Sequence, residues 1–136
     1  MRVPLITAAA ATFALLISVV PVQAHHSFAA EYDSKKPIKI TGTVTKVEWM
    51  NPHARFYVST KGDDGKVTNW NFELGAIPVL LKQGWRKSSL KEGDQVTVDG
   101  FMAKDASNSA NARSVVLADG RKVFAGSSLE NQAPNQ

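Results

Sequence analysis

The sequence has no cysteine among its 136 residues. Disulfide bonds, on which many small exported domains depend, are therefore excluded, and a hydrophobic core has to stabilise the fold. A chain of this length is long enough to do so as one domain. Histidine is also scarce, with three in the whole chain, so the position of each histidine is informative.

Several signatures of enzymes and nucleic-acid-binding proteins are missing as well. We find no internal repeat, no convincing Ser-His-Asp arrangement, no glycine-rich phosphate loop and no zinc-protease helix. The net charge of +4 is small, and both signs are spread along the chain. The charge therefore makes no strong case for a nucleic-acid partner, and we predict that the protein is not an enzyme.

One long apolar segment is present, at residues 3–20. It follows a basic Arg2 and precedes the triplet VQA at residues 22–24. This combination is typical of a signal peptide with its cleavage site, whereas an uncleaved membrane anchor needs about 20 apolar residues and no such site. We predict a signal peptide over residues 1–24 and a periplasmic or secreted protein without a membrane segment after cleavage.

The rest of the chain has the patterning of β-structure. Residues 25–37 form a polar lead-in, after which apolar and polar residues alternate. The parity of this alternation changes at Thr45-Lys46, which predicts a bulge in one long bent strand over about residues 38–50. Further strands are predicted at about residues 54–58, 70–74, 96–102 and 115–117, with a short sixth at 121–124.

The alternation is interrupted at residues 75–85, GAIPVLLKQGW. Pro78 near the start of this segment and Gly84 near its end predict one short helix. Three strands, a helix and two strands favour a small, mainly β, five-stranded OB-like barrel over residues 38–126, rather than an open sandwich. Residues 127–136 are polar and are predicted to be a disordered tail.

Two of the three histidines, His25 and His26, directly follow the predicted cleavage site. Cleavage there would free the amine of His25, which can chelate a metal ion together with the near nitrogen of its own ring. Imidazole suits copper, zinc and nickel, and copper(II) binds most tightly of these. A terminal histidine resembles the histidine brace of some exported copper proteins, which needs one more histidine from the fold. We therefore predict a copper(II) site at His25, His26 and His53.

Each of these histidines also has a simpler interpretation. The terminal pair can be a hydrophilic start, and His53 can be a turn cap with its ring bonded to backbone after Pro52. Distance is a further constraint, because His53 lies beyond the far end of a first strand that climbs up to about 40 Å. The lead-in, about 40 Å long when extended, would have to run back along the barrel or meet a second chain.

A second hypothesis needs no metal. Arg55 and Tyr57 lie on the opposite side of the second strand from Phe56. Together with Trp70 they are a candidate ligand-binding face for an oligosaccharide, a nucleic acid or a partner protein, since aromatic rings stack on bases and sugars. The competing interpretation of the tryptophans is ordinary packing in the core.

Four segments resemble one family. AHHSFAAEYD, GTVTKVEWMNPH, GW followed by SLKEGD, and ADGRKVFAG are similar to motifs of a family of small exported bacterial proteins, a domain of unknown function. The resemblance extends over residues 25–126. It implies little about function, but it places His25, His26 and His53 within the family's recognisable motifs.

Overall fold

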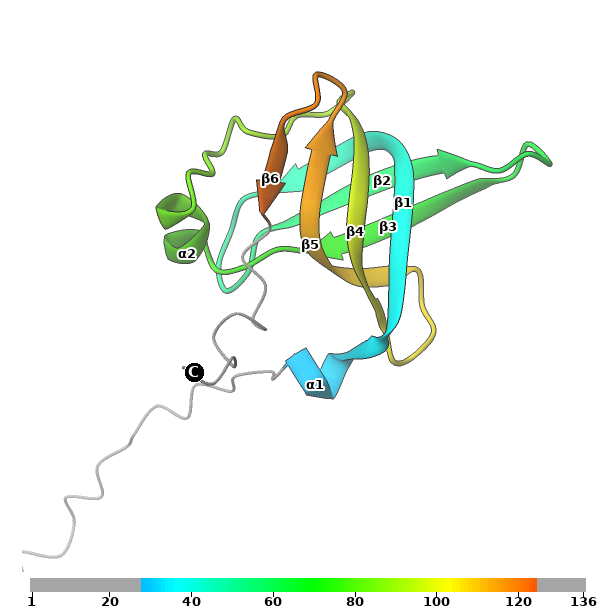
Figure 1. Cartoon of the computed structure of the whole chain (residues 1–136), viewed down its shortest axis with the longest axis horizontal. Coiled ribbons are helices and arrows are strands. Elements are labelled where there is room, and N and C mark those ends of the chain that lie inside the picture. The colour runs from blue at the N-terminus through cyan, green and yellow to red at the C-terminus, as the bar shows by residue number, and fades with distance from the viewer. Residues whose placement is uncertain (1–27, 125–136) are drawn as a thin grey trace, which may run out of the picture.

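The computed structural model describes residues 28–124 as a curled sheet with two short helices (Figure 1). The helices are α1 (Phe28–Glu31) and α2 (Ile77–Lys82). The strands are β1 (Tyr32–Glu48), β2 (Arg55–Lys61), β3 (Val67–Glu73), β4 (Gln95–Ala103), β5 (Ser109–Leu117) and β6 (Lys122–Phe124). The predicted signal peptide and the predicted tail lie outside the described residues.

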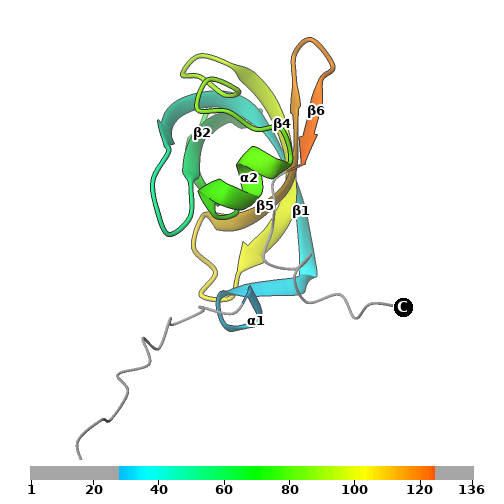
Figure 2. The same cartoon turned by 90° about the vertical axis from the view of Figure 1, so that its left-hand side faces the viewer.

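Closure of the sheet makes it a barrel. The strand order is β3-β2-β1-β4-β5-β6, and β3 also pairs with β5 in parallel, residue 72 lying opposite residue 110. Figure 2 shows the ring end-on, with α2 across its opening. The mainly β, OB-like fold is confirmed, as is one helix between β3 and β4. The count of five strands was wrong for the sheet as a whole, because β6 adds a sixth beside β5, outside the closed ring.

The bend in β1 allows one strand to serve both halves of the barrel. β1 pairs with β4 up to Thr43 and with β2 from Thr43 onward. The register with β2 shifts between Val44 and Lys46, which confirms the predicted bulge. Gly42 sits at the same bend, where an added Cβ would lie 2.3 Å from the carbonyl oxygen of Ser59. The close approach of β1 to β2 therefore requires glycine at this position.

The first strand begins earlier than predicted. β1 starts at Tyr32, directly after α1, and not near residue 38. Tyr32 pairs with Ala103, and the register then shifts before Pro37 pairs with Phe101. The intervening residues DSKKP contain no apolar residue to reveal a strand, so periodicity could not detect it.

Two apolar clusters hold the described chain together. The main one fills the barrel and includes the predicted inner residues of β2 and β3 together with buried residues of α2, β4 and β5. Its largest fully buried side chains are Trp85, Phe56, Phe72, Leu74 and Leu80. A smaller cluster outside the barrel consists of Phe28, Tyr32 and Ala103, with Phe101 packed against it. This outer cluster fastens α1 to the end of β4. Within the described residues, neither helix is long and apolar enough to cross a membrane.

Two of the tryptophans that contact the barrel core, Trp85 and Trp70, should contribute differently to stability. Trp85 is 1% exposed, whereas Trp70 is partly buried and stacks on Phe72 at a centroid distance of 6.3 Å. Trp85→Ala should lower the free energy of unfolding by about 3–5 kcal/mol. Trp70→Ala should cost less, about 1–3 kcal/mol. Urea denaturation of both variants tests this ranking, and an equal or larger loss for Trp70→Ala would contradict it.

Candidate functional site

A buried carboxylate joins three distant segments of the chain. Glu73, the last residue of β3, is 5% exposed although it is acidic. Its Oε2 accepts hydrogen bonds from the hydroxyl of Tyr32 at 3.1 Å and from Nη2 of Arg55 at 2.6 Å. Its Oε1 lies 3.2 Å from Nδ1 of His53. We call Glu73 and these three partners the Glu73 cluster.

Barrel geometry brings the members of the cluster together. Arg55 and Glu73 are directly opposite each other on β2 and β3, on the outer face of the sheet. His53 lies in the turn after the cis peptide bond between Asn51 and Pro52. Two backbone hydrogen bonds hold this turn against the end of β3, one from the amide of Ala54 to Gly75 and one from the amide of Leu74 to Ala54. Tyr32 comes from the other end of β1.

The charge of Glu73 explains why it needs all three partners. An ionised carboxylate loses its hydration when it is buried, and only hydrogen bonds and opposite charges compensate for that loss. The guanidinium of Arg55 supplies both, and the phenol of Tyr32 supplies a further donor. Removal of any one partner would leave part of a buried charge uncompensated.

The ring of His53 contacts a side chain, because its Nδ1 lies 3.2 Å from Oε1 of Glu73. In the neutral imidazole, a hydrogen bond to this carboxylate would place the proton on Nδ1, because a carboxylate only accepts. The lone pair of Nε2 would then be available for another partner. The side chain is 30% exposed. His53 is therefore an oriented imidazole at the edge of a buried cluster.

The predicted partners His25 and His26 lie outside the described residues. The described chain begins at Phe28, which is 3% exposed and stacks near Tyr32 at a centroid distance of 5.6 Å. Tyr32 in turn contacts the carboxylate that holds His53. Because β1 starts at Tyr32 and curls around the barrel, Phe28 is anchored beside the Glu73 cluster. The predicted approach of His25 and His26 to His53 falls on residues outside the described chain.

The structure separates the three residues of the alternative ligand-binding face. Arg55 belongs to the Glu73 cluster, and Tyr57 is two residues further along the same outer face of β2, where it donates to Oε2 of Glu48 at 3.1 Å. Trp70 pairs with Val58 and stacks on Phe72, which are core residues. Trp70 therefore lies on the inner face of the sheet, and the three side chains do not form one surface.

Sequence reasoning did not find Tyr32 as a member of the site, nor the hub role of Glu73. The alternation of this strand places Glu73 on the polar side, between the inward-facing Phe72 and Leu74, so periodicity gives no sign that it is buried. Asn111 was also missed. It is 1% exposed, lies opposite Glu73 on β5, and neither polar atom of its side chain has a hydrogen-bond partner within the described chain.

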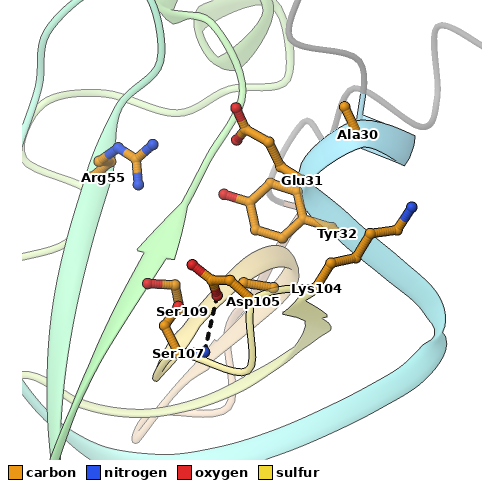
Figure 3. A pocket seen from close by; sticks show the side chains of 9 residues that line it. Ala30, Glu31, Tyr32, Arg55, Lys104, Asp105, Ser107 and Ser109 are labelled. Atoms are coloured by element: carbon orange, nitrogen blue, oxygen red, sulfur yellow. Dashed lines mark hydrogen bonds between the residues drawn. The ribbon is translucent and has the colours of Figure 1, made fainter.

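An open pocket of about 390 Å³ lies beside the cluster (Figure 3). Figure 3 shows Arg55 on one side, Tyr32 and Glu31 facing it, and the loop between β4 and β5 closing the remainder. In that loop, Oδ1 of Asp105 accepts the amide of Ser107 at 2.9 Å. The lining residues are Ala30, Glu31, Tyr32, Arg55, Ala103, Lys104, Asp105, Ser107 and Ser109.

The pocket contains both signs of charge. Hydrogen bonds from the Ser107 side chain and backbone hold the pKa of Asp105 below its ordinary value, so this carboxylate is ionised at neutral pH. Arg55 and Lys104 carry positive charges, and Glu31 is a second carboxylate on the lining. Among residues 28–124, no group of three or more histidine, aspartate and glutamate side chains is arranged to hold a metal ion.

The fold and the site define a small OB-like barrel with a buried ionic cluster on its outer face. The chain belongs to a family of unknown function (DUF6152), whose model matches residues 13–112. No curated protein matches the chain. Among solved structures, it is similar to the mitochondrial single-stranded DNA binding protein Rim1 from S. cerevisiae, with 14% identity and a TM-score of 0.49, over 61% of this chain and 93% of that one.

The hydroxyl of Tyr32 should contribute measurably to stability. Tyr32→Phe removes only this donor to Glu73, and the free energy of unfolding should fall by about 1.5–3 kcal/mol because the acceptor is a buried charge. Tyr57→Phe is a matched control, since its hydroxyl donates to the more exposed Glu48 over the same 3.1 Å. The control should cost less than about 1 kcal/mol in chemical denaturation. Equal losses would contradict the special role of Glu73.

The pH dependence of the same variant provides a second readout. Burial, together with the nearby charge of Glu73, raises the pKa of Tyr32 well above its ordinary value of about 10. The folded state therefore holds the phenolic proton more tightly than the unfolded state does. This contribution to stability is complete below about pH 10 and declines above it. The wild-type protein should lose stability more steeply above pH 10 than Tyr32→Phe, whereas parallel curves would contradict the assignment.

Proposed function

We propose that this protein is a periplasmic or secreted metal-binding protein that holds copper(II) through His25, His26 and His53. Cleavage after Ala24 would make His25 the first residue and free its amine. The amine and the near ring nitrogen of His25 would then chelate the ion. His26 and His53 would add imidazole ligands, and the proposed role is binding and not catalysis.

The contact between His53 and Glu73 is the observation that carries this proposal. Histidines that bind metals almost always donate their other ring N–H to a carboxylate or a carbonyl, which fixes the tautomer and the ring orientation. The position of His53 is compatible with this arrangement, since its Nδ1 lies 3.2 Å from Oε1 of Glu73 and its side chain is 30% exposed. A turn cap would not need a buried carboxylate supported by Arg55 and Tyr32.

The anchoring of α1 supports the participation of the amino terminus. Phe28 and Tyr32 pack in the outer cluster, and Tyr32 bonds to the same carboxylate as His53. Three residue steps from Phe28 back to His25 span at most about 11 Å. The proposed ligands therefore start from an anchored point next to the Glu73 cluster, within one chain.

The choice of copper(II) rests on the ligands. Three imidazoles and an amine are all nitrogen donors, for which the order of stability places copper(II) above nickel and zinc. Neither cysteine nor a cluster of methionines is available to favour copper(I). Copper(II) should accordingly bind more tightly than zinc at the same pH.

The first test compares amino termini and His53. The mature protein, exported without a tag and confirmed by intact mass to span residues 25–136, is titrated with copper(II) by calorimetry in a weakly coordinating buffer. One residue added before His25 should weaken binding at least tenfold, about 1.4 kcal/mol, because the amine leaves the chelate. His53→Ala should also weaken binding. Equal affinities for the mature and extended forms would exclude the proposed chelate.

The second test addresses the carboxylate that orients His53. Glu73→Gln keeps the size of the side chain but removes its charge, and the copper(II) affinity should fall about 10-fold or more, as is typical for such supporting partners. Glu48→Gln is the matched control, because Glu48 also accepts a tyrosine hydroxyl but does not contact His53. Circular dichroism confirms that both variants are folded. An unchanged affinity in Glu73→Gln would remove the main support for His53 as a ligand.

A further inference from the structure

We propose that the pocket beside the Glu73 cluster binds a small zwitterion, a free α-amino acid with one ammonium and one carboxylate group. The proposal does not depend on copper binding. The relevant residues are Arg55 from β2, Asp105 from the β4–β5 loop, Ser109 at the start of β5, and Glu31 at the end of α1 (Figure 3).

Size limits the class of ligand. A volume of about 390 Å³ is at the lower end of the range for small-molecule sites. It accommodates an amino acid but not a folded partner or a stretch of nucleic acid. The lining comes from α1, β1, β2, β4, β5 and the loop between β4 and β5, so the pocket exists only in the folded barrel.

The arrangement of charge favours a ligand that carries both signs. The guanidinium of Arg55 uses Nη2 for Glu73 and makes a long contact of 3.4 Å from Nη1 to Asn71. Arginine has five N–H donors in a planar fork, so further donors remain for a carboxylate in the pocket. The hydroxyl of Ser109, on the same lining, can donate to that carboxylate as well.

The opposite end of the ligand would face acceptors. Asp105 closes the pocket from the β4–β5 loop, and its Oδ1 is held in place by the amide of Ser107 at 2.9 Å. A carboxylate has about four lone-pair positions, so Asp105 retains acceptor capacity beside this bond. Glu31 adds a second negative charge to the lining. An ammonium group matches this side of the pocket. A simple anion or a simple cation would match only one of the two sides.

Asn111 is a second, independent indication that this region is polar. Asn111 and Ser109 are two residues apart on β5 and therefore point to the same side of the strand. Within the described chain the buried amide of Asn111 has no hydrogen-bond partner. A buried amide without a partner lowers stability, and this one follows the lining residue Ser109 on the same side of β5.

The experiment uses the mature, metal-free protein in the presence of a chelator, so that copper(II) has no influence on the result. L-alanine and L-glutamine are titrated and followed by amide chemical shifts. Alaninamide, which lacks the carboxylate, N-acetylalanine, which lacks the ammonium, and glucose, a neutral polyol, are titrated in parallel. We expect the zwitterions to shift the amides of Ser107 and Ser109 and to bind at least tenfold more tightly than the three analogues.

Two variants locate the site. Asp105→Asn keeps an oxygen that can accept the amide of Ser107 but removes the charge, and it should weaken zwitterion binding at least tenfold. Ser109→Ala should weaken it to a smaller extent. Asp64→Asn is the matched control, because Oδ1 of Asp64 accepts the amide of Lys66 at 2.9 Å in an equivalent turn far from the pocket. No shifts with either zwitterion, an equal response to any analogue, or unchanged affinity in Asp105→Asn would overturn the proposal.

Discussion

The buried charge of Glu73 is the constraint on which the outer face of this barrel depends. A carboxylate that is 5% exposed is stable only when its hydrogen-bond acceptors are satisfied and its charge is opposed. The partners that meet this requirement are Arg55 on β2, His53 in the turn before β2, and Tyr32 at the start of β1. The position of α1, the turn at Pro52 and the end of β3 are therefore linked through one side chain.

The interior and the outer face of the barrel have different physical roles. The interior is apolar and contains Trp85 and the paired rings of Phe56 and Phe72, whose centroids are 5.2 Å apart. Such a core stabilises the fold but has no charged groups that could bind a ligand. The polar groups are concentrated where β2, β3 and β5 meet outside the core, because parallel pairing of β3 with β5 brings Asn111 opposite Glu73. Both proposals concern this polar seam.

Local patterns in the sequence were sufficient to predict most elements of the fold. The change of parity at Thr45-Lys46 required a bulge, and the Pro78 to Gly84 segment required a helix, since both signals depend only on neighbouring residues. The early start of β1 was not predictable in this way. Residues 33–36 have no apolar alternation, and the pairings of Tyr32 and Pro37 with β4 fix the two ends of this stretch. The alternation of apolar and polar residues correctly placed Trp70 toward the core. A side chain in that position cannot belong to a binding face on the outside of the barrel.

By itself, the sequence determined most of the strand pattern, the helix between β3 and β4, the absence of disulfides and the short list of histidines from which a metal site could be built. These properties follow from residue identity and spacing. Only the tertiary structure decided that His53 lies beside Glu73, that Tyr32 shares this carboxylate, and that Arg55 belongs both to the cluster and to the lining of a pocket. Tyr32 and Glu73 are 41 positions apart in the chain. Their contact results from closure of the barrel, a long-range event that no local pattern encodes.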